Sequence, residues 1–128
     1  MKLPIIINEQ SAEPLYYQIE TQLRSLILSG VVVPGTLLPS IREFATQLKC
    51  SVITIKRVYS DLEAEGLLRT KQGTGTYVLE LEVESMVRQQ EEALQEAINS
   101  FFNTVHKLNI DKDKIIQAFQ TALERYDR

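Results

Sequence analysis

The stretch that decides the fold is "SVITIKRVY", residues 51–59. It begins with four residues that favour strands because their side chains branch at Cβ: Val52, Ile53, Thr54 and Ile55. The apolar residues that follow recur at a helical spacing, which a strand would scatter over two faces: Ile55, Val58, Tyr59 and Leu62. Ser51 suits a helix N-cap. The sequence therefore predicts a helix here, at a propensity cost of a few tenths of a kcal/mol per β-branched residue.

Two further helices are predicted before this one. Pro14 precedes apolar residues with spacings of three and four, which indicates an amphipathic helix that ends near Gly30. The tetrapeptide Ser40-Ile41-Arg42-Glu43 has the pattern of a capping box and predicts the start of a short helix. Between them, Pro34-Gly35 indicates a turn, with room for a short strand near Leu37.

A β-hairpin is predicted after the helix at 52–65. Residues 67–70 and 76–79 read as strands, and the glycine-containing stretch 71–75 reads as the tip between them. Helix, turn, helix and hairpin together make a winged helix-turn-helix. We therefore expect a mainly α fold with a small β-hairpin, in which residues 1–80 form a DNA-binding domain.

Residues 81–128 are predicted to form a C-terminal helical hairpin that mediates dimerisation. Apolar residues with a heptad-like spacing indicate one long helix, and Asp111 is suited to cap a second. Two helices alone have too little volume to bury both apolar faces. We therefore expect a homodimer, with these residues in its interface: Val87, Leu94, Ile98, Phe101, Val105, Leu108, Ile115, Phe119 and Leu123.

Several classes of function are disfavoured by the composition. A single cysteine excludes an intramolecular disulfide, and no set of residues has the spacing of a metal or cofactor site. Gly73-Thr74-Gly75-Thr76 lacks the strand and helix context of a nucleotide-binding loop. No apolar run is long enough to cross a bilayer. We expect a cytoplasmic protein that is not an enzyme, has no cofactor and makes no membrane contact.

The charges are distributed unevenly along the chain. Residues 14–78 carry a net charge of +2 and residues 79–128 carry a net charge of −4. The net charge of the whole chain is −3. In a helix-turn-helix the N-terminal end of the second helix meets base edges in the major groove, and a wing can reach the backbone or minor groove. The predicted DNA contacts are Arg42, Ser51, Val52, Ile53, Thr54, Lys56, Arg57, Lys71, Gln72 and Gly73.

The order and spacing of several motifs over residues 14–78 resemble the GntR family of bacterial transcription regulators. The segments that carry the resemblance are Pro14-Leu15-Tyr16-Tyr17-Gln18-Ile19, Leu38-Pro39-Ser40-Ile41-Arg42-Glu43, Asp61 to Leu68 and Gly73 to Val78. The short tail is similar to that of the YtrA subfamily, which implies dimerisation. The resemblance implies base contacts by Arg42 and Lys56 and phosphate contacts by Ser51 and Thr54. Many members have glycine where this chain has Lys49, and arginine where it has Val52.

The hypothesis that follows is a homodimeric repressor on a palindromic double-stranded DNA operator. Arg42 and Lys56 would read purine acceptors, and Val52 and Ile53 would contact thymine methyl groups. The modest basic excess predicts a shallow dependence of affinity on salt. The alternative is a winged-helix module that binds a protein partner, which selection from a random DNA pool would distinguish. Whether a small-molecule effector binds is left open.

Overall fold

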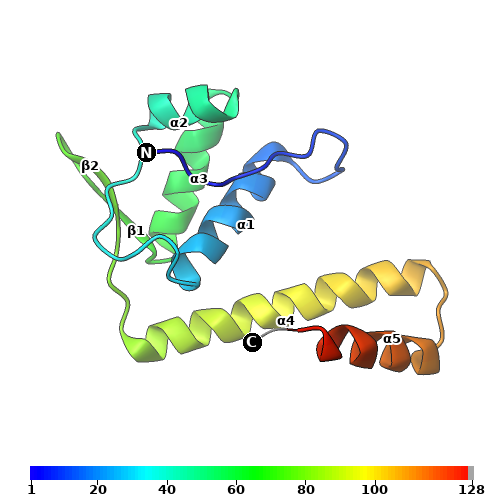
Figure 1. Ribbon diagram of the computed structural model, residues 1–128. Coiled ribbons are helices and arrows are strands. Elements are labelled where there is room, and N and C mark those ends of the chain that lie inside the picture. Colours follow the sequence, from blue (N-terminus) through cyan, green and yellow to red (C-terminus); the bar gives the residue numbers. More distant parts are fainter. Residues whose placement is uncertain (127–128) are drawn as a thin grey trace. The chain divides into compact units, whose positions relative to one another are not determined.

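The computed structural model describes residues 1–126, and this described part is mainly helical with one β-hairpin (Figure 1). Its elements are α1 Leu15–Leu28, α2 Ile41–Leu48, α3 Val52–Ala64, β1 Leu68–Lys71, β2 Gly75–Val78, α4 Val83–Lys107 and α5 Lys112–Glu124. The predicted fold class is confirmed. The chain divides into two compact units, Met1–Val87 and Arg88–Arg128.

The stretch at residues 51–59 is helical, as its periodicity predicts. Ser51 caps α3, and its Oγ accepts the backbone N–H of Thr54 at 3.1 Å. The buried residues of the helix are the four that the spacing places on one face: Ile55, Val58, Tyr59 and Leu62. Burial of each large apolar side chain contributes on the order of 2 kcal/mol, which outweighs the low propensity of the β-branched first turn.

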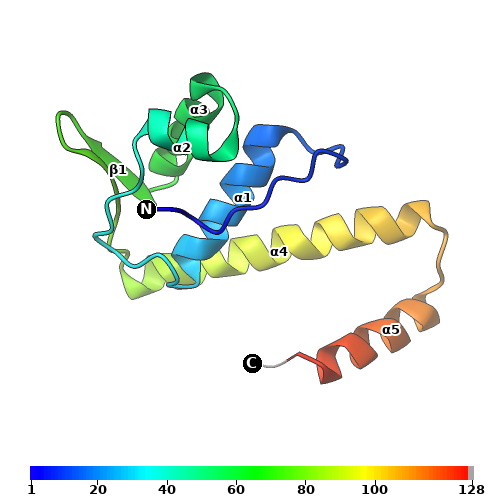
Figure 2. The ribbon, with the colours of Figure 1, turned by 45° about the horizontal axis from the view of Figure 1, so that its top comes forward.

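The core of the first unit lies where α1 and α2 pack against α3 and where α3 packs against β1. Figure 2 shows these three helices together, with the N-terminal segment running beside α1. Gln22 on α1 holds that segment by two hydrogen bonds to the backbone of Ile6, at 2.9 and 2.7 Å. The largest fully buried side chains are Phe44, Ile19, Leu23, Ile55, Leu62, Leu67, Leu68 and Val58.

The ends of α1 and α2 largely follow the sequence signals. Pro14 is the N-cap of α1 rather than its first helical residue. The predicted capping box is present in α2, where Glu43 N–H donates to Ser40 Oγ at 3.1 Å and Ser40 N–H donates to Glu43 Oε1 at 3.4 Å. Helix α2 ends at Leu48, and its C-cap Lys49 has a left-handed conformation, with a φ of 55° and a ψ of 46°. This conformation favours glycine, so Lys49 carries local backbone strain.

The hairpin forms a wing whose strands are one residue closer to the tip than the sequence predicts. Lys71 pairs with Gly75, which leaves only residues 72–74 as the tip. The connection before α2 lies against the other edge of β2, because Leu38 N–H donates to the Thr76 carbonyl at 2.9 Å. Gly75 has a φ of +131°, and a Cβ there would lie 2.9 Å from Leu37 Cδ1. Glycine therefore allows the wing and the connection to approach closely.

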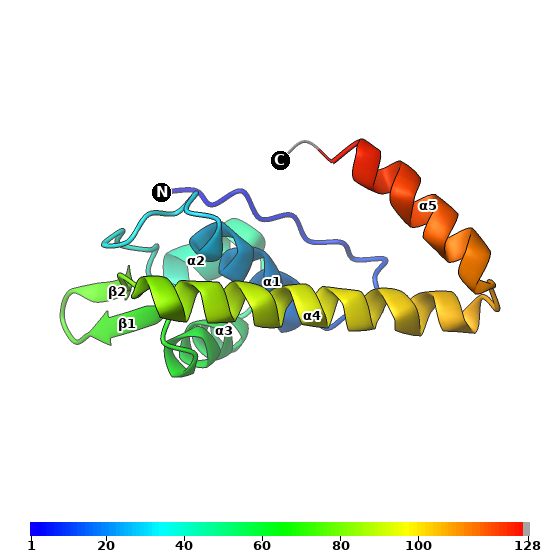
Figure 3. The same ribbon diagram turned by 90° about the horizontal axis from the view of Figure 1, so that it is seen from below.

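The second unit consists of most of α4 together with α5, and Figure 3 shows α5 diverging from α4 after the turn between them. Asp111 caps α5 as predicted, since its Oδ1 accepts the Lys114 N–H at 3.0 Å. No residue from 88 to 126 is buried within a single chain. None of the helices in the described residues is both long and apolar enough to cross a membrane.

Candidate nucleic-acid interface and apolar helix faces

Helix α3 presents a polar and aliphatic face on the side opposite the core. Three of its exposed residues lie about half a turn from the buried row: Ile53, Lys56 and Ser60. Val52 lies at the border of this face and is 45% exposed, whereas Ile53 is 79% exposed. A helix that offers aliphatic side chains and a lysine to solvent in this way has a surface suited to the major groove.

The first turn of α3 can also hold a phosphate. The Ser51 and Thr54 hydroxyl groups lie 2.8 Å apart and share a hydrogen bond. The backbone N–H groups of a helix N-terminus are partly unpaired and carry positive partial charge, which favours an anion. The predicted roles of Ser51 and Thr54 are therefore compatible with their positions.

The other predicted contacts lie on α2 and on the wing, and all of them are exposed. Arg42 is the second residue of α2. Lys71 ends β1, and its Nζ lies 5.9 Å from the centre of the Tyr77 ring. Gln72 and Gly73 form the tip, where Gly73 has a φ of +83° that the tight turn requires. These residues are available for contact with DNA.

Arg57 differs from the other predicted contacts because it is engaged within the protein. Its guanidinium carbon lies 3.6 Å from the centre of the Tyr16 ring on α1. Its Nε lies 3.7 Å from Asp61 Oδ2, one turn further along α3. A cation over an aromatic face is attracted by the ring quadrupole. Arg57 thus links α3 to α1, and a DNA contact by it stays a prediction.

This link belongs to a row of polar contacts between α1 and α3, which we call the α1–α3 seam. Its members are spaced four residues apart on each helix and meet in order: Tyr16 with Arg57, Glu20 with Asp61, and Arg24 with Glu65. The last pair is bidentate, with Arg24 Nε and Nη2 donating to the Glu65 carboxylate at 2.9 and 2.8 Å. Because the partners advance together, the two helices run in the same direction, and the seam fixes their register.

Glu20 is the buried member of the seam, and its side chain is only 9% exposed. The pKa of Glu20 is raised from 4.5 to about 7, mainly by burial and further by the negative charge of Asp61 and a hydrogen bond with its carboxyl group. Arg24, whose Nη2 lies 3.5 Å from Glu20 Oε1, acts in the opposite direction. The centre of the seam therefore contains a buried carboxyl group, Glu20, whose pKa lies near neutral pH beside Asp61.

The α1–α3 seam is not predicted from the sequence. One indication of it is present there, because Glu20 falls between the core residues Ile19 and Leu23 and lies four residues before Arg24. A carboxyl group on the inner face of an amphipathic helix is uncommon, since burial disfavours its charged form. What the sequence does not show is the partner, because Asp61 is 41 positions away along the chain.

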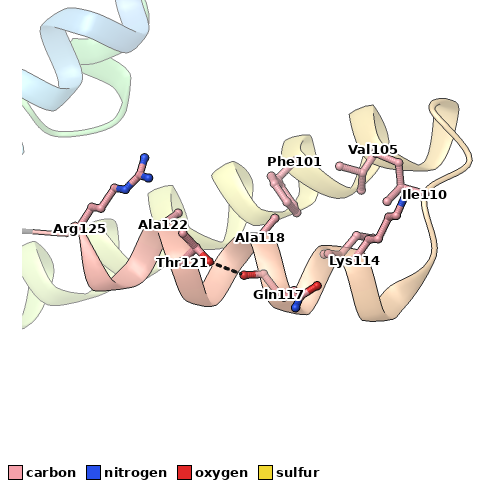
Figure 4. A pocket seen from close by; sticks show the side chains of 10 residues that line it. Phe101, Val105, Ile110, Lys114, Gln117, Ala118, Thr121, Ala122 and Arg125 are labelled. Carbon is pink, nitrogen blue, oxygen red and sulfur yellow. Dashed lines mark hydrogen bonds between the residues drawn. The ribbon is translucent and has the colours of Figure 1, made fainter.

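The second unit has open apolar grooves between α4 and α5. One groove of about 680 Å³ has Phe101 and Val105 of α4 on one side and α5 on the other (Figure 4). In α5 the Thr121 hydroxyl donates to the Gln117 carbonyl at 3.0 Å. A second groove of about 550 Å³ contains Ile98 and Phe119. Most of the predicted dimerisation residues are thus exposed in one chain, and Val105 and Ile115 are half-buried.

Comparison with known proteins agrees with this arrangement. The family model "Bacterial regulatory proteins, gntR family" matches residues 15–78. The HTH-type transcriptional repressor YtrA of Bacillus subtilis is 32% identical over 111 residues, which cover 87% of this chain and 85% of YtrA. A GntR family transcriptional regulator from Listeria monocytogenes has a similar structure, with a TM-score of 0.71 and 30% identity over 88% of this chain and 97% of that chain.

A third similar structure contains DNA. It is the DNA-binding domain of AraR in complex with operator ORX1, with a TM-score of 0.53 and 30% identity over 61% of this chain and 98% of that chain. The fold and these relatives define a DNA-binding transcription regulator. The chain belongs to the GntR family of bacterial regulatory proteins. Because the match to YtrA extends beyond the winged domain, it confirms the predicted resemblance to the YtrA subfamily.

Proposed function

We propose that the protein is a homodimeric repressor that binds a palindromic double-stranded DNA operator. The observation that carries the proposal is the outer face of α3, where Ile53 and Lys56 are exposed beside a capped N-terminus. The AraR domain, which shares this fold, is found on operator DNA. In our proposal α3 enters the major groove, Ser51 and Thr54 hold a phosphate, and Arg42 and Lys56 contact purine acceptors.

The wing supplies a second contact in this proposal. Lys71, Gln72 and Gly73 are exposed at its tip and would meet the DNA backbone or the minor groove. Arg57 has a different role, because its guanidinium lies over Tyr16. It would hold α3 in register with α1, so that the residues of the first turn keep a fixed geometry on the DNA.

The second unit supplies the two-fold axis of the proposed dimer. Within residues 88–126 no side chain is buried, yet Phe101 and Phe119 line apolar grooves. Exposed apolar area of this kind is costly in water, and a second copy of the same surface is the simplest cover. A two-fold symmetric dimer presents two copies of α3, which favours an operator with inverted half-sites.

The DNA-binding part of the proposal is tested by selection from a random double-stranded DNA pool with the full chain. We expect enrichment of an inverted repeat, and loss of this enrichment in the double variant Arg42→Ala and Lys56→Ala. Lys107→Ala, at the exposed end of α4, is the control for loss of a positive charge. Equal enrichment by the double variant, or no enrichment by the native chain, would reject the proposal.

The dimerisation part is tested in the full chain by sedimentation at a fixed protein concentration. Phe101→Glu places a charge in the apolar grooves of the second unit and should shift the dimer to a monomer. Asn103→Glu introduces the same charge on the opposite side of α4, where the residue is exposed, and should leave the dimer intact. A native chain that is monomeric, or a Phe101→Glu variant that stays dimeric, would contradict the proposed interface.

A further inference from the structure

Two adjacent aliphatic side chains are exposed in the first turn of α3. Ile53 is 79% exposed and lies on the side of α3 opposite to the buried row that contains Ile55. Val52 is 45% exposed at the edge of the same face. An isolated exposed aliphatic residue needs no explanation, but two adjacent ones occupy the turn that a recognition helix presents to base edges.

Because one of the two cationic side chains of α3 is engaged within the protein, the two aliphatic residues have more influence on recognition. Of the two cationic side chains of α3, a helix that is described in full, Arg57 is held over Tyr16 at 3.6 Å and near Asp61. Lys56 is the other, and it is exposed. Ser51 caps the helix and shares a hydrogen bond with the Thr54 hydroxyl, so both hydroxyl groups are engaged at the helix end. The outer surface of the first turn is therefore mainly aliphatic.

The groove offers one apolar group to such a surface. In the major groove the bases present hydrogen-bond donors and acceptors, and thymine alone adds a methyl group at C5. An aliphatic side chain cannot pair with a donor or acceptor, and it would leave one without water if placed against it. From the exposure and position of Ile53 and Val52 we infer that they select operator half-sites with thymine at the position that faces the first turn of α3. This inference rests on the proposed operator binding.

The experiment uses the full chain and the duplex that emerges from selection in a random pool. The selected half-sites should contain a constant thymine. Replacement of that thymine by deoxyuridine removes only the methyl group, and it should weaken binding about fourfold per methyl contact. In the Ile53→Ala variant the thymine and deoxyuridine duplexes should bind equally. The same measurement on Val52→Ala gives the part of the thymine preference that Val52 contributes.

Two controls isolate the contact. Ile6→Ala truncates another isoleucine of the same unit that is 80% exposed, and it should keep the fourfold preference for thymine. Deoxyuridine placed outside the half-sites should not change binding. Because the Ile53 side chain is exposed, its truncation should not alter the helical circular dichroism spectrum, which confirms that the variant is folded.

The outcomes separate this inference from the proposed function. Enrichment of a sequence without a constant thymine, equal binding of both duplexes by the native chain, or a thymine preference that survives both Ile53→Ala and Val52→Ala would overturn the inference and leave operator binding intact. No enrichment at all would overturn both. A preference for thymine that disappears with Ile53→Ala supports the inference.

Discussion

Among substitutions in the winged unit, Glu20→Gln should have the largest effect on how its stability depends on pH. Glutamine keeps the length of the side chain and can donate its amide N–H to Asp61, but it does not ionise. The folded-state pKa of Glu20 is about 7, whereas the ordinary value of 4.5 applies to the unfolded chain. A raised pKa means that the stabilising contribution is complete below pH 4.5 and is lost as pH rises through 7.

The size of the effect follows from the two pKa values. The difference between 4.5 and about 7 corresponds to a total loss of about 3 kcal/mol once the group is ionised in both states. Most of this loss, roughly 2 to 3 kcal/mol, occurs between about pH 5 and about pH 8. The side chain is 9% exposed, so solvent screens this carboxyl group little.

The assay is urea unfolding of the full chain followed by far-ultraviolet circular dichroism, with both variants at the same protein concentration. The stability of Glu20→Gln relative to the native chain should be higher by roughly 2 to 3 kcal/mol at about pH 8 than at about pH 5. Comparison at the same pH cancels the other titrating groups. Glu9→Gln, an exposed site before α1, controls for the change in net charge. A difference between the Glu20→Gln and native chains that does not vary with pH would refute the raised pKa of Glu20 at the centre of the α1–α3 seam.

Three further predictions concern single residues. Lys49→Gly should raise stability by about 1 kcal/mol in urea unfolding, because glycine relieves the left-handed conformation at φ 55°; a loss of stability would contradict the strain. Tyr59→Phe should lower stability by about 1 to 2 kcal/mol, because the 2.7 Å hydrogen bond from its hydroxyl to the buried Pro39 carbonyl is lost; a neutral effect would count against that role. Lys56→Ala should weaken binding of the selected duplex roughly tenfold or more while it affects a scrambled duplex less; an equal effect on both would indicate a phosphate contact.

The elements of the fold could be predicted from local signals. The spacing of Ile55, Val58 and Tyr59 overrides the β-branched start of α3 because burial of a face contributes more than local propensity. The capping box at Ser40 and the cap at Asp111 mark helix starts, because their side chains accept hydrogen bonds from backbone N–H groups that have no partner within the helix. The sequence predicts the strands of the wing one residue further from the tip than they are, since pairing depends on how Gly75 fits against the connection before α2.

The contacts between elements could not be predicted in the same way. Arg57 reads as an exposed cation at the edge of the DNA-facing surface, but the structure holds it over Tyr16. Such a contact depends on the register of two helices that are distant in sequence, and residue periodicity defines faces without defining register. The same reason hides the pairing of Glu20 with Asp61. The exposed first turn of α3 could be predicted, because it depends only on which face is buried.

In the proposed mode of binding, two copies of this chain place two α3 helices on one operator. The most direct test is the stoichiometry of the full chain on its selected duplex, measured by sedimentation of the complex together with the sequence of the site. We expect two chains on each duplex and an inverted repeat whose half-site centres lie about one helical turn of DNA, or a multiple of it, apart. We also expect the Phe101→Glu variant to lose this complex. One chain bound per duplex, or a selected site without two-fold symmetry, would contradict the proposed mode of binding.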